Sequence, residues 1–185
     1  ACAVSAQGWG IGFKLGDPSG LSVKRYNGES AFELDLGRAH PFANDQFYYD
    51  FYDRWYDGKH FGYTAHQFIG YRATVPLAVQ LHWLKQRSVK GADGLEWYLG
   101  LGAQVRWQTV DLAYRYKVAG DNDWIYVDAE RVTAIDLGVD GVLGLEYKFK
   151  NAPLSLFLDG TLFMEVVDDP FLFWPQFGFG ARYRF

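Results

Sequence analysis

A regular alternation of bulky apolar side chains with small or polar ones runs through most of this 185-residue chain. The segment 95–107 shows it best and reads LEWYLGLGAQVRW. Because successive side chains of a β-strand point to opposite faces, this pattern predicts strands with one apolar and one polar face. Charges, glycines or prolines interrupt every apolar run well before the ~20 residues that a membrane-spanning helix needs. The alternation therefore excludes a helical membrane protein and predicts an all-β fold.

Eight segments carry the pattern, with turn residues such as Asn27-Gly28 between them. Short connections at 27–29 and 150–153 would lie at one end of the sheet, and long connections at 38–60, 117–131 and 167–173 at the other. An even number of consecutive antiparallel strands is typical of an up-and-down barrel. No helix of useful length is expected, and the stretch 76–94 stays open between a strand extension and one helical turn. The expected strands cover residues 8–16, 21–26, 30–37, 61–75, 95–107, 135–148, 154–165 and 176–185.

Side-chain size indicates which face of the strands lies inside. Nine glycines belong to the polar face, whereas the apolar face is bulky. The lumen of an eight-stranded barrel is only just wide enough to be filled by side chains, so the small face fits inside. Apolar side chains that point outward are the pattern of a membrane barrel. We therefore predict a single domain over residues 7–185, an eight-stranded antiparallel up-and-down transmembrane β-barrel.

The charged side chains of the polar face carry both signs in nearly equal number. Together with Arg184, they comprise eight acids and seven bases. Buried charges are tolerated when they are paired and hydrogen-bonded, so these side chains are expected to form a charge network in the lumen. The alternative is an ordinary solvated strand face. The candidate network consists of Lys14, Lys24, Glu33, Asp35, Arg72, Glu96, Arg106, Asp136, Asp140, Glu146, Lys148, Asp159, Glu165 and Arg182.

Aromatic residues gather at expected strand ends and in the long connection. Aromatics at both rims would form the girdles of a membrane barrel, with Trp107 and Tyr63 at the long-loop rim. The loop 41–61 interleaves aromatic and acidic residues, which can anchor a partner protein or a glycan. Packing of these side chains on each other is the equal alternative. The candidate partner-contact residues of the loop are Tyr48, Tyr49, Tyr52, Trp55 and Tyr56, and those of the short-turn girdle are Trp9, Tyr147, Phe149 and Phe185.

The terminal segment 178–185 reads GFGARYRF, with an aromatic residue in the last position. It is similar to the assembly signal of small outer-membrane β-barrel proteins of Gram-negative bacteria, the OmpA/OmpX-like eight-stranded class. The segments 10–24 and 144–149 resemble uncharacterised Bacteroidetes members of that class. The resemblance implies an outer-membrane location with both termini periplasmic. It also implies three contacts: a bilayer with a lipopolysaccharide outer leaflet, the barrel-assembly machinery through Phe179, Tyr183 and Phe185, and other outer-membrane proteins.

The N-terminal residues, the net charge and the cysteine count narrow the possible functions further. A small-x-small pattern, Val4-Ser5-Ala6, predicts that residues 1–6 are the end of a secretory signal peptide, or else a flexible N-terminus. The net charge of -4 argues against a nucleic-acid partner. Cys2 is the single cysteine, so no internal disulfide is expected, and no cofactor or metal site is predicted.

A filled lumen leaves little room for a water path, so a structural or interaction protein is the expected function, as an accessory subunit of a larger outer-membrane complex. Two alternatives stay open, a narrow channel and an outer-membrane lipid-modifying enzyme. The enzyme would draw on His40, His60 and His66 beside the aspartates of the long loop. No catalytic motif is recognised there, so no catalytic residue is assigned.

Overall fold

The computed structural model describes residues 8–40, 45–59, 61–167 and 171–185. Within them, one helix lies among nine strands. The expected signal-peptide end at residues 1–6 and Cys2 lie outside the described residues. The elements are β1 (Trp9–Gly16), β2 (Ser19–Asn27), β3 (Ser30–Arg38), α1 (Asp45–Lys59), β4 (Ala65–Ala73), β5 (Leu77–Ser88), β6 (Leu95–Lys117), β7 (Ile125–Lys148), β8 (Leu154–Glu165) and β9 (Phe173–Arg184).

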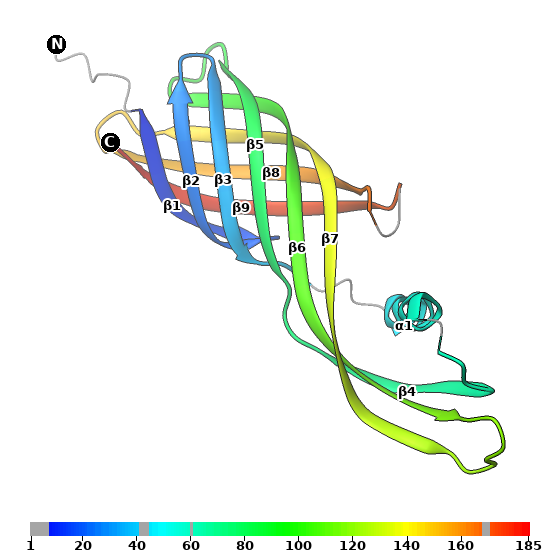
Figure 1. Cartoon of the computed structure of the whole chain (residues 1–185). Helices are drawn as coiled ribbons and strands as arrows, with labels where there is room; N and C mark the ends of the chain where they lie inside the picture. Colours follow the sequence, from blue (N-terminus) through cyan, green and yellow to red (C-terminus); the bar gives the residue numbers. More distant parts are fainter. Residues whose placement is uncertain (1–7, 41–44, 60, 168–170) are drawn as a thin grey trace. The chain divides into compact units, whose positions relative to one another are not determined.

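Eight of the strands close into an antiparallel ring. Its order is β6-β5-β3-β2-β1-β9-β8-β7, and a further pairing of β7 with β6 completes the circle. Figure 1 shows these strands side by side, from blue β1 to red β9. Neighbours in the ring follow one another along the chain, apart from the closing β9–β1 pair and the β3–β5 pair, which flanks β4. The predicted all-β, antiparallel, up-and-down arrangement with eight strands in the ring is confirmed.

The fourth strand of the ring is β5, so the prediction that segment 61–75 takes this place was wrong. Strand β5 pairs with β3 on one side and with β6 on the other. Its sequence LAVQLHWLKQRS alternates as the other strands do, with Leu81 and Trp83 outward and Gln80 and His82 inward. Alternation alone does not say with which neighbour a strand pairs. Strand β4 pairs instead with the later part of β6, with a register shift near Phe68.

The chain divides into two compact units, and the ring belongs to the first, residues 1–39, 77–107 and 135–185. The second unit comprises residues 40–76 and 108–134 and has its own hydrophobic core. In that core, aromatic side chains of α1 pack against Val110, Leu112 and Tyr114 of β6. The expectation of no useful helix between the strands was wrong, because a spacing of four residues aligns the buried tyrosines of α1 along one helical face.

The burial pattern of the ring matches the predicted direction of its two faces. Phe13 and Leu101, on the apolar face, are 72% and 69% exposed. The polar face is buried, and its glycines make room for large neighbours. A Cβ added to Gly144 would overlap the ring of Tyr98, and one added to Gly138 would overlap Phe163. At these two positions, glycine is therefore required by the volume of the aromatic side chain opposite.

Candidate functional site

The interior of the ring holds a connected set of buried charges, which is the candidate functional site. Around Lys14 of β1, the ammonium donates to Asp35 Oδ2 of β3 at 3.0 Å and lies 3.0 Å from Asp159 Oδ1 of β8. The side chains of all three residues are almost wholly buried. One lysine thus links three strands that are distant in sequence, and the up-and-down topology brings these strands around a common interior.

A second group of charges surrounds Arg182 of β9. Its Nη2 atom lies 2.8 Å from Glu33 Oε2, and its Nη1 atom lies 4.0 Å from Glu146 Oε1. The same guanidinium donates to Ser22 Oγ through Nε and Nη2. Lys24 completes the group, because its ammonium donates to Glu146 at 3.0 Å and lies 3.5 Å from Glu33. Two carboxylates thus share two cations, which offsets much of the cost of burying each charge.

Aromatic rings fill the space beside these cations. The Lys24 ammonium lies 4.1 Å from the centroid of the Tyr98 ring, and the Arg182 guanidinium lies 3.6 Å from that of Phe157. Such cation–π contacts stabilise desolvated cations by about 2 kcal/mol. The rings also occupy the volume that glycines on neighbouring strands leave free. In this part of the ring, side chains rather than an open passage occupy the interior.

Toward the other end of the ring, buried amides accompany the charges. The Gln80 amide donates to Gln104 Oε1 at 2.7 Å and to Gln176 Oε1 at 2.9 Å. The Arg106 guanidinium, also buried, lies 3.9 Å from Asp17 Oδ2. These contacts join β5, β6, β9 and the turn after β1, so the polar filling extends along the ring.

The structure places the predicted network residues as follows. Eleven of the fourteen are buried, whereas Glu96 and Lys148 are partly exposed and form a 2.7 Å ion pair with each other. The prediction for Arg72 was wrong, because this residue is exposed and lies on β4 in the second unit. The eleven buried residues are Lys14, Lys24, Glu33, Asp35, Arg106, Asp136, Asp140, Glu146, Asp159, Glu165 and Arg182.

Sequence reasoning missed several interior residues, and with them the charge balance. The alternation within β5 could have identified Gln80 and His82, but the stretch 76–94 was left open. Asp17 is also buried. Among the described residues, eight buried carboxylates accompany only four buried lysines and arginines. The near equality of acids and bases predicted from the sequence was therefore wrong, because three of the seven bases counted, Arg72, Lys148 and Arg184, are not buried.

The candidate partner-contact residues lie on α1 rather than in a loop. Tyr48, Tyr52 and Tyr56 are buried in the core of the second unit, and Trp55 is partly buried against it. Only Tyr49 of the five is mainly exposed, at 48%. The alternative interpretation, in which these aromatics pack on each other, describes four of them. Burial raises the pKa of the Tyr52 phenol.

The histidines considered for catalysis do not gather into one site among the described residues. His66 lies 3.1 Å from the Tyr52 hydroxyl through Nδ1, and its ring stacks on Tyr56 at 3.6 Å between centroids. This histidine is thus part of the aromatic cluster of the second unit. His40 is exposed, and His60 lies outside the described residues.

The aromatic residues of the expected assembly signal point outward. Phe179, Tyr183 and Phe185, the expected assembly signal, are each more than half exposed. Tyr183 lies opposite Ile11 of β1, at the seam where the last strand pairs with the first. The prediction that Tyr63 belongs to a rim girdle was wrong, because this side chain stacks on Tyr116 within the second unit.

Comparison with models of known protein families found no match, and a search of curated proteins found no relative of this sequence either. In the described part of the chain, no helix combines the length and the apolar character needed to cross a bilayer. The interior of the ring and its outer surface are thus the features from which a function must be argued.

Proposed function

We propose that the chain is a transmembrane β-barrel of a bacterial outer membrane, with a filled and charge-paired interior, that acts as a structural or interaction protein. The observation that carries this proposal is the inverted burial of the ring. Charged side chains are buried inside it, whereas leucine, isoleucine and phenylalanine side chains are exposed outside it. Water would solvate the opposite arrangement.

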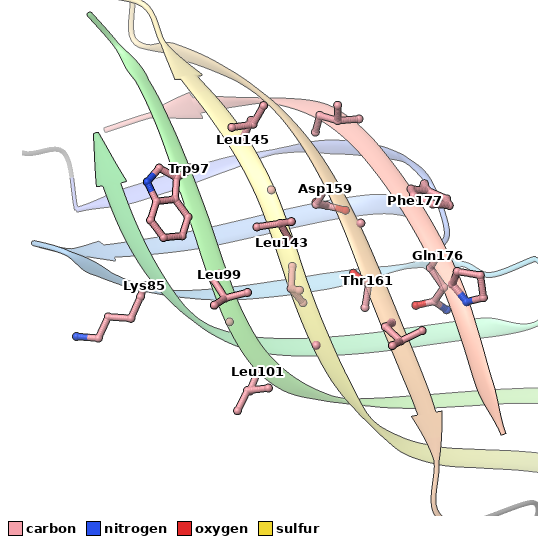
Figure 2. Close-up of a pocket in the computed structure, with 18 of the residues that line it drawn as sticks. Lys85, Trp97, Leu99, Leu101, Leu143, Leu145, Asp159, Thr161, Gln176 and Phe177 are labelled. Carbon is pink, nitrogen blue, oxygen red and sulfur yellow. The ribbon is translucent and has the colours of Figure 1, made fainter. Parts of the chain in front are cut away.

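The extent of the apolar surface supports a lipid environment. Exposed apolar side chains occur on all eight ring strands, from Ile11 on β1 to Phe179 on β9. A soluble monomer rarely exposes an apolar patch larger than a few hundred Å². Figure 2 shows one part of this surface, an apolar pocket lined by Leu99, Leu143 and Leu145 of β6 and β7. Acyl chains of lipids would cover these side chains in a bilayer.

The dimensions of the strands support the same environment. A strand that crosses a bilayer needs about 9–11 residues. Strands β2 and β3 have 9 residues each, and β5, β8 and β9 have 12 each. Exposed aromatics lie at the end of the ring that carries the short turns after β2 and β7, among them Trp9, Tyr147, Phe149 and Phe185. Aromatic residues prefer the interface between lipid and water.

The filled interior favours a structural or interaction role over transport. The buried salt bridges and aromatic rings leave the ring interior occupied along β1, β3, β8 and β9. The second unit would then supply the accessible surface for a partner. Strands β6 and β7 have 23 and 24 residues, which exceeds the length a bilayer crossing requires. In the proposal, the residues beyond the crossing lie outside the membrane and contact other outer-membrane components, as in an accessory subunit.

Expression of the full chain in a Gram-negative host tests the membrane location. Membranes would be separated by density, and the chain would be run on gels with and without heating. We expect the chain in the outer-membrane fraction, with a faster-migrating band before heating. In planar bilayers, we expect no stable open conductance level. Recovery of the chain as a soluble protein would refute the location, and a steady open level would refute the filled interior.

Exposed aromatics of the second unit offer a test of partner binding. Tyr126 is 58% exposed, and its hydroxyl accepts a hydrogen bond from Arg115 at 3.0 Å. Replacing Tyr49 and Tyr126 together by serine should abolish co-purification of a partner from detergent-solubilised membranes. Phenylalanine at both positions, which keeps the rings, serves as the matched control. Equal co-purification with the wild-type and serine chains would contradict the interaction role of this surface.

A further inference from the structure

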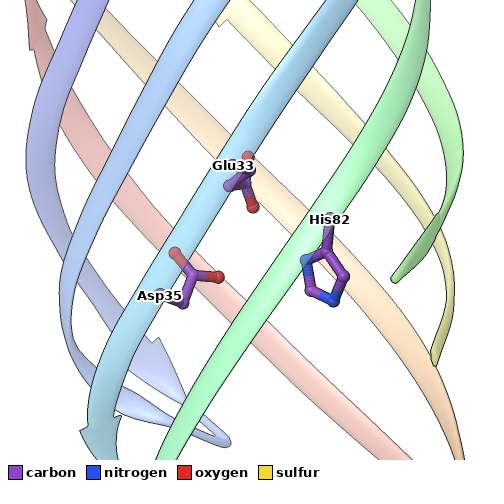
Figure 3. Close-up of side chains that lie close together, drawn as sticks. All are labelled: Glu33, Asp35 and His82. Atoms are coloured by element: carbon purple, nitrogen blue, oxygen red, sulfur yellow. The ribbon is translucent and has the colours of Figure 1, made fainter. Parts of the chain in front are cut away.

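Glu33, Asp35 and His82 converge in the interior of the ring, and one potential ligand atom from each lies within 4.8 Å of the others. The strand register explains the convergence. Glu33 of β3 lies directly opposite His82 of β5, and Asp35 follows two residues later on the same face. Figure 3 shows the three side chains pointing toward one another from these two strands. All three are buried.

Each of the three residues keeps at least one polar atom without a hydrogen-bond partner. Glu33 Oε2 lies 2.8 Å from Arg182 Nη2 in an ion pair, and Asp35 Oδ2 accepts a hydrogen bond from Lys14. Within the described residues, Glu33 Oε1, Asp35 Oδ1 and His82 Nδ1 have no hydrogen-bond partner. A buried polar atom without a partner costs about 1–3 kcal/mol, so a cation bound between these three residues would offset part of that cost.

The other ring nitrogen of His82 indicates that the bound group would be a cation. Nε2 lies 3.1 Å from Asp140 Oδ2, in position for the ring to donate its proton to this carboxylate. An imidazole that donates from Nε2 keeps a lone pair on Nδ1. A carboxylate behind a histidine is the usual support of a histidine that binds a metal ion, because it holds the tautomer and the ring orientation. Nδ1, which has no hydrogen-bond partner among the described residues, thus keeps an electron pair for a cation.

The charge of the interior also favours a bound cation. Among the described residues, the eight buried carboxyl groups outnumber the four buried lysines and arginines two to one. A charge in a low-dielectric interior is costly unless an opposite charge compensates it. A divalent ion would add positive charge to this acid-rich interior.

We propose that Glu33, Asp35 and His82 form a binding site for a divalent first-row transition-metal ion inside the ring. Two carboxylate oxygens and one imidazole nitrogen are ligands that suit Zn²⁺, Mn²⁺, Fe²⁺ and Co²⁺. Ligand atoms about 2.1 Å from such an ion lie ~3.4 Å apart in tetrahedral geometry. The three ligand atoms, which lie within 4.8 Å of one another, would therefore approach one another by up to ~1.4 Å when an ion binds.

Cobalt binding during folding tests the site. The full chain would be folded with Co²⁺ in the buffer, passed through a desalting column, and analysed for cobalt per chain and for visible d–d absorption. His82→Gln is the decisive variant, because glutamine places a polar group near the Nε2 position beside Asp140 but none at Nδ1. Thr161→Val is the matched control, because it removes a buried hydroxyl that is not a ligand.

We expect one cobalt ion per chain in the wild type and in Thr161→Val, with d–d bands, and at least a tenfold lower content in His82→Gln. Folding of each variant would be checked by its unheated gel band. Should His82→Gln fail to fold, Asp35→Asn, which keeps the side-chain shape, takes its place with the same expectation. A wild-type chain that folds but retains no cobalt would overturn the proposal, as would a folded His82→Gln chain that retains one ion.

Discussion

Replacing Leu101 by arginine separates a lipid-facing ring from a water-facing one. Leu101 lies in the middle of the part of β6 that belongs to the ring, opposite Trp83 of β5, and is 69% exposed. On a water-exposed surface, this substitution should change the free energy of unfolding by no more than ~0.5 kcal/mol. At the midplane of a bilayer, it should cost about 2–4 kcal/mol. The second value lowers the folding equilibrium constant roughly 30- to 700-fold.

The matched variant is Leu154→Arg, at the first residue of β8 and therefore at the rim of the ring. Near the interface, the cost of arginine falls to ~0–1 kcal/mol. Both variants and the wild type would be folded into phosphatidylcholine vesicles and unfolded at equilibrium with urea, with tryptophan fluorescence as the signal. A difference of about 2 kcal/mol between the two variants is expected. Equal costs at Leu101 and Leu154 would refute the lipid-facing interpretation.

Three further predictions concern the interior and the second unit. Arg182→Met should destabilise the ring by ~3–5 kcal/mol, because it leaves buried Glu33 without its closest cation. Arg184→Met, at the partly exposed strand end, should cost under ~1 kcal/mol. Urea unfolding measures both costs, and equal costs would contradict the buried network. Tyr52→Ala should cost the second unit ~3–5 kcal/mol and speed proteolysis within α1, whereas an unchanged cleavage rate would argue against its packing there. Burial raises the pKa of Tyr114 from 10.0 to about 12. The neutral phenol therefore stabilises the second unit below pH 10, and this stabilisation is lost as the pH rises toward 12. Titration followed by absorbance at 295 nm should show a late-ionising tyrosine that Tyr114→Phe removes.

The positions of the ring strands could largely be predicted from the sequence, because the side-chain period of a strand is a local property. Segments around Ile11, Leu101 and Phe179 alternate clearly, and the structure has strands there. The size of the side chains also predicted which face is inside, because the small glycines of that face leave room for large rings such as Tyr98 and Phe163. These inferences need no knowledge of which strands are neighbours.

Strand pairing and the helix could not be predicted in the same way. Segments 65–73 and 77–88 both pair with β6, and only the tertiary structure decides that the second belongs to the ring. In α1, the aromatic residues Tyr48, Tyr52 and Tyr56 also have a helical spacing, but the acidic residues between them favoured the interpretation as a loop. The core that these tyrosines join is formed by residues more than 50 positions later in the chain, at Val110, Leu112 and Tyr114.

The sequence by itself determined the all-β class and the direction of the two strand faces, because both depend on local alternation and side-chain volume. The predicted count of eight ring strands agreed only because segment 61–75 was counted in place of β5. Only the tertiary structure decided which charges meet. Lys14 joins Asp35 and Asp159, and His82 faces Glu33, because strand register brings together residues that are far apart in the chain. The same register leaves more acids than bases inside the ring, an imbalance that follows from which residues closure of the ring buries.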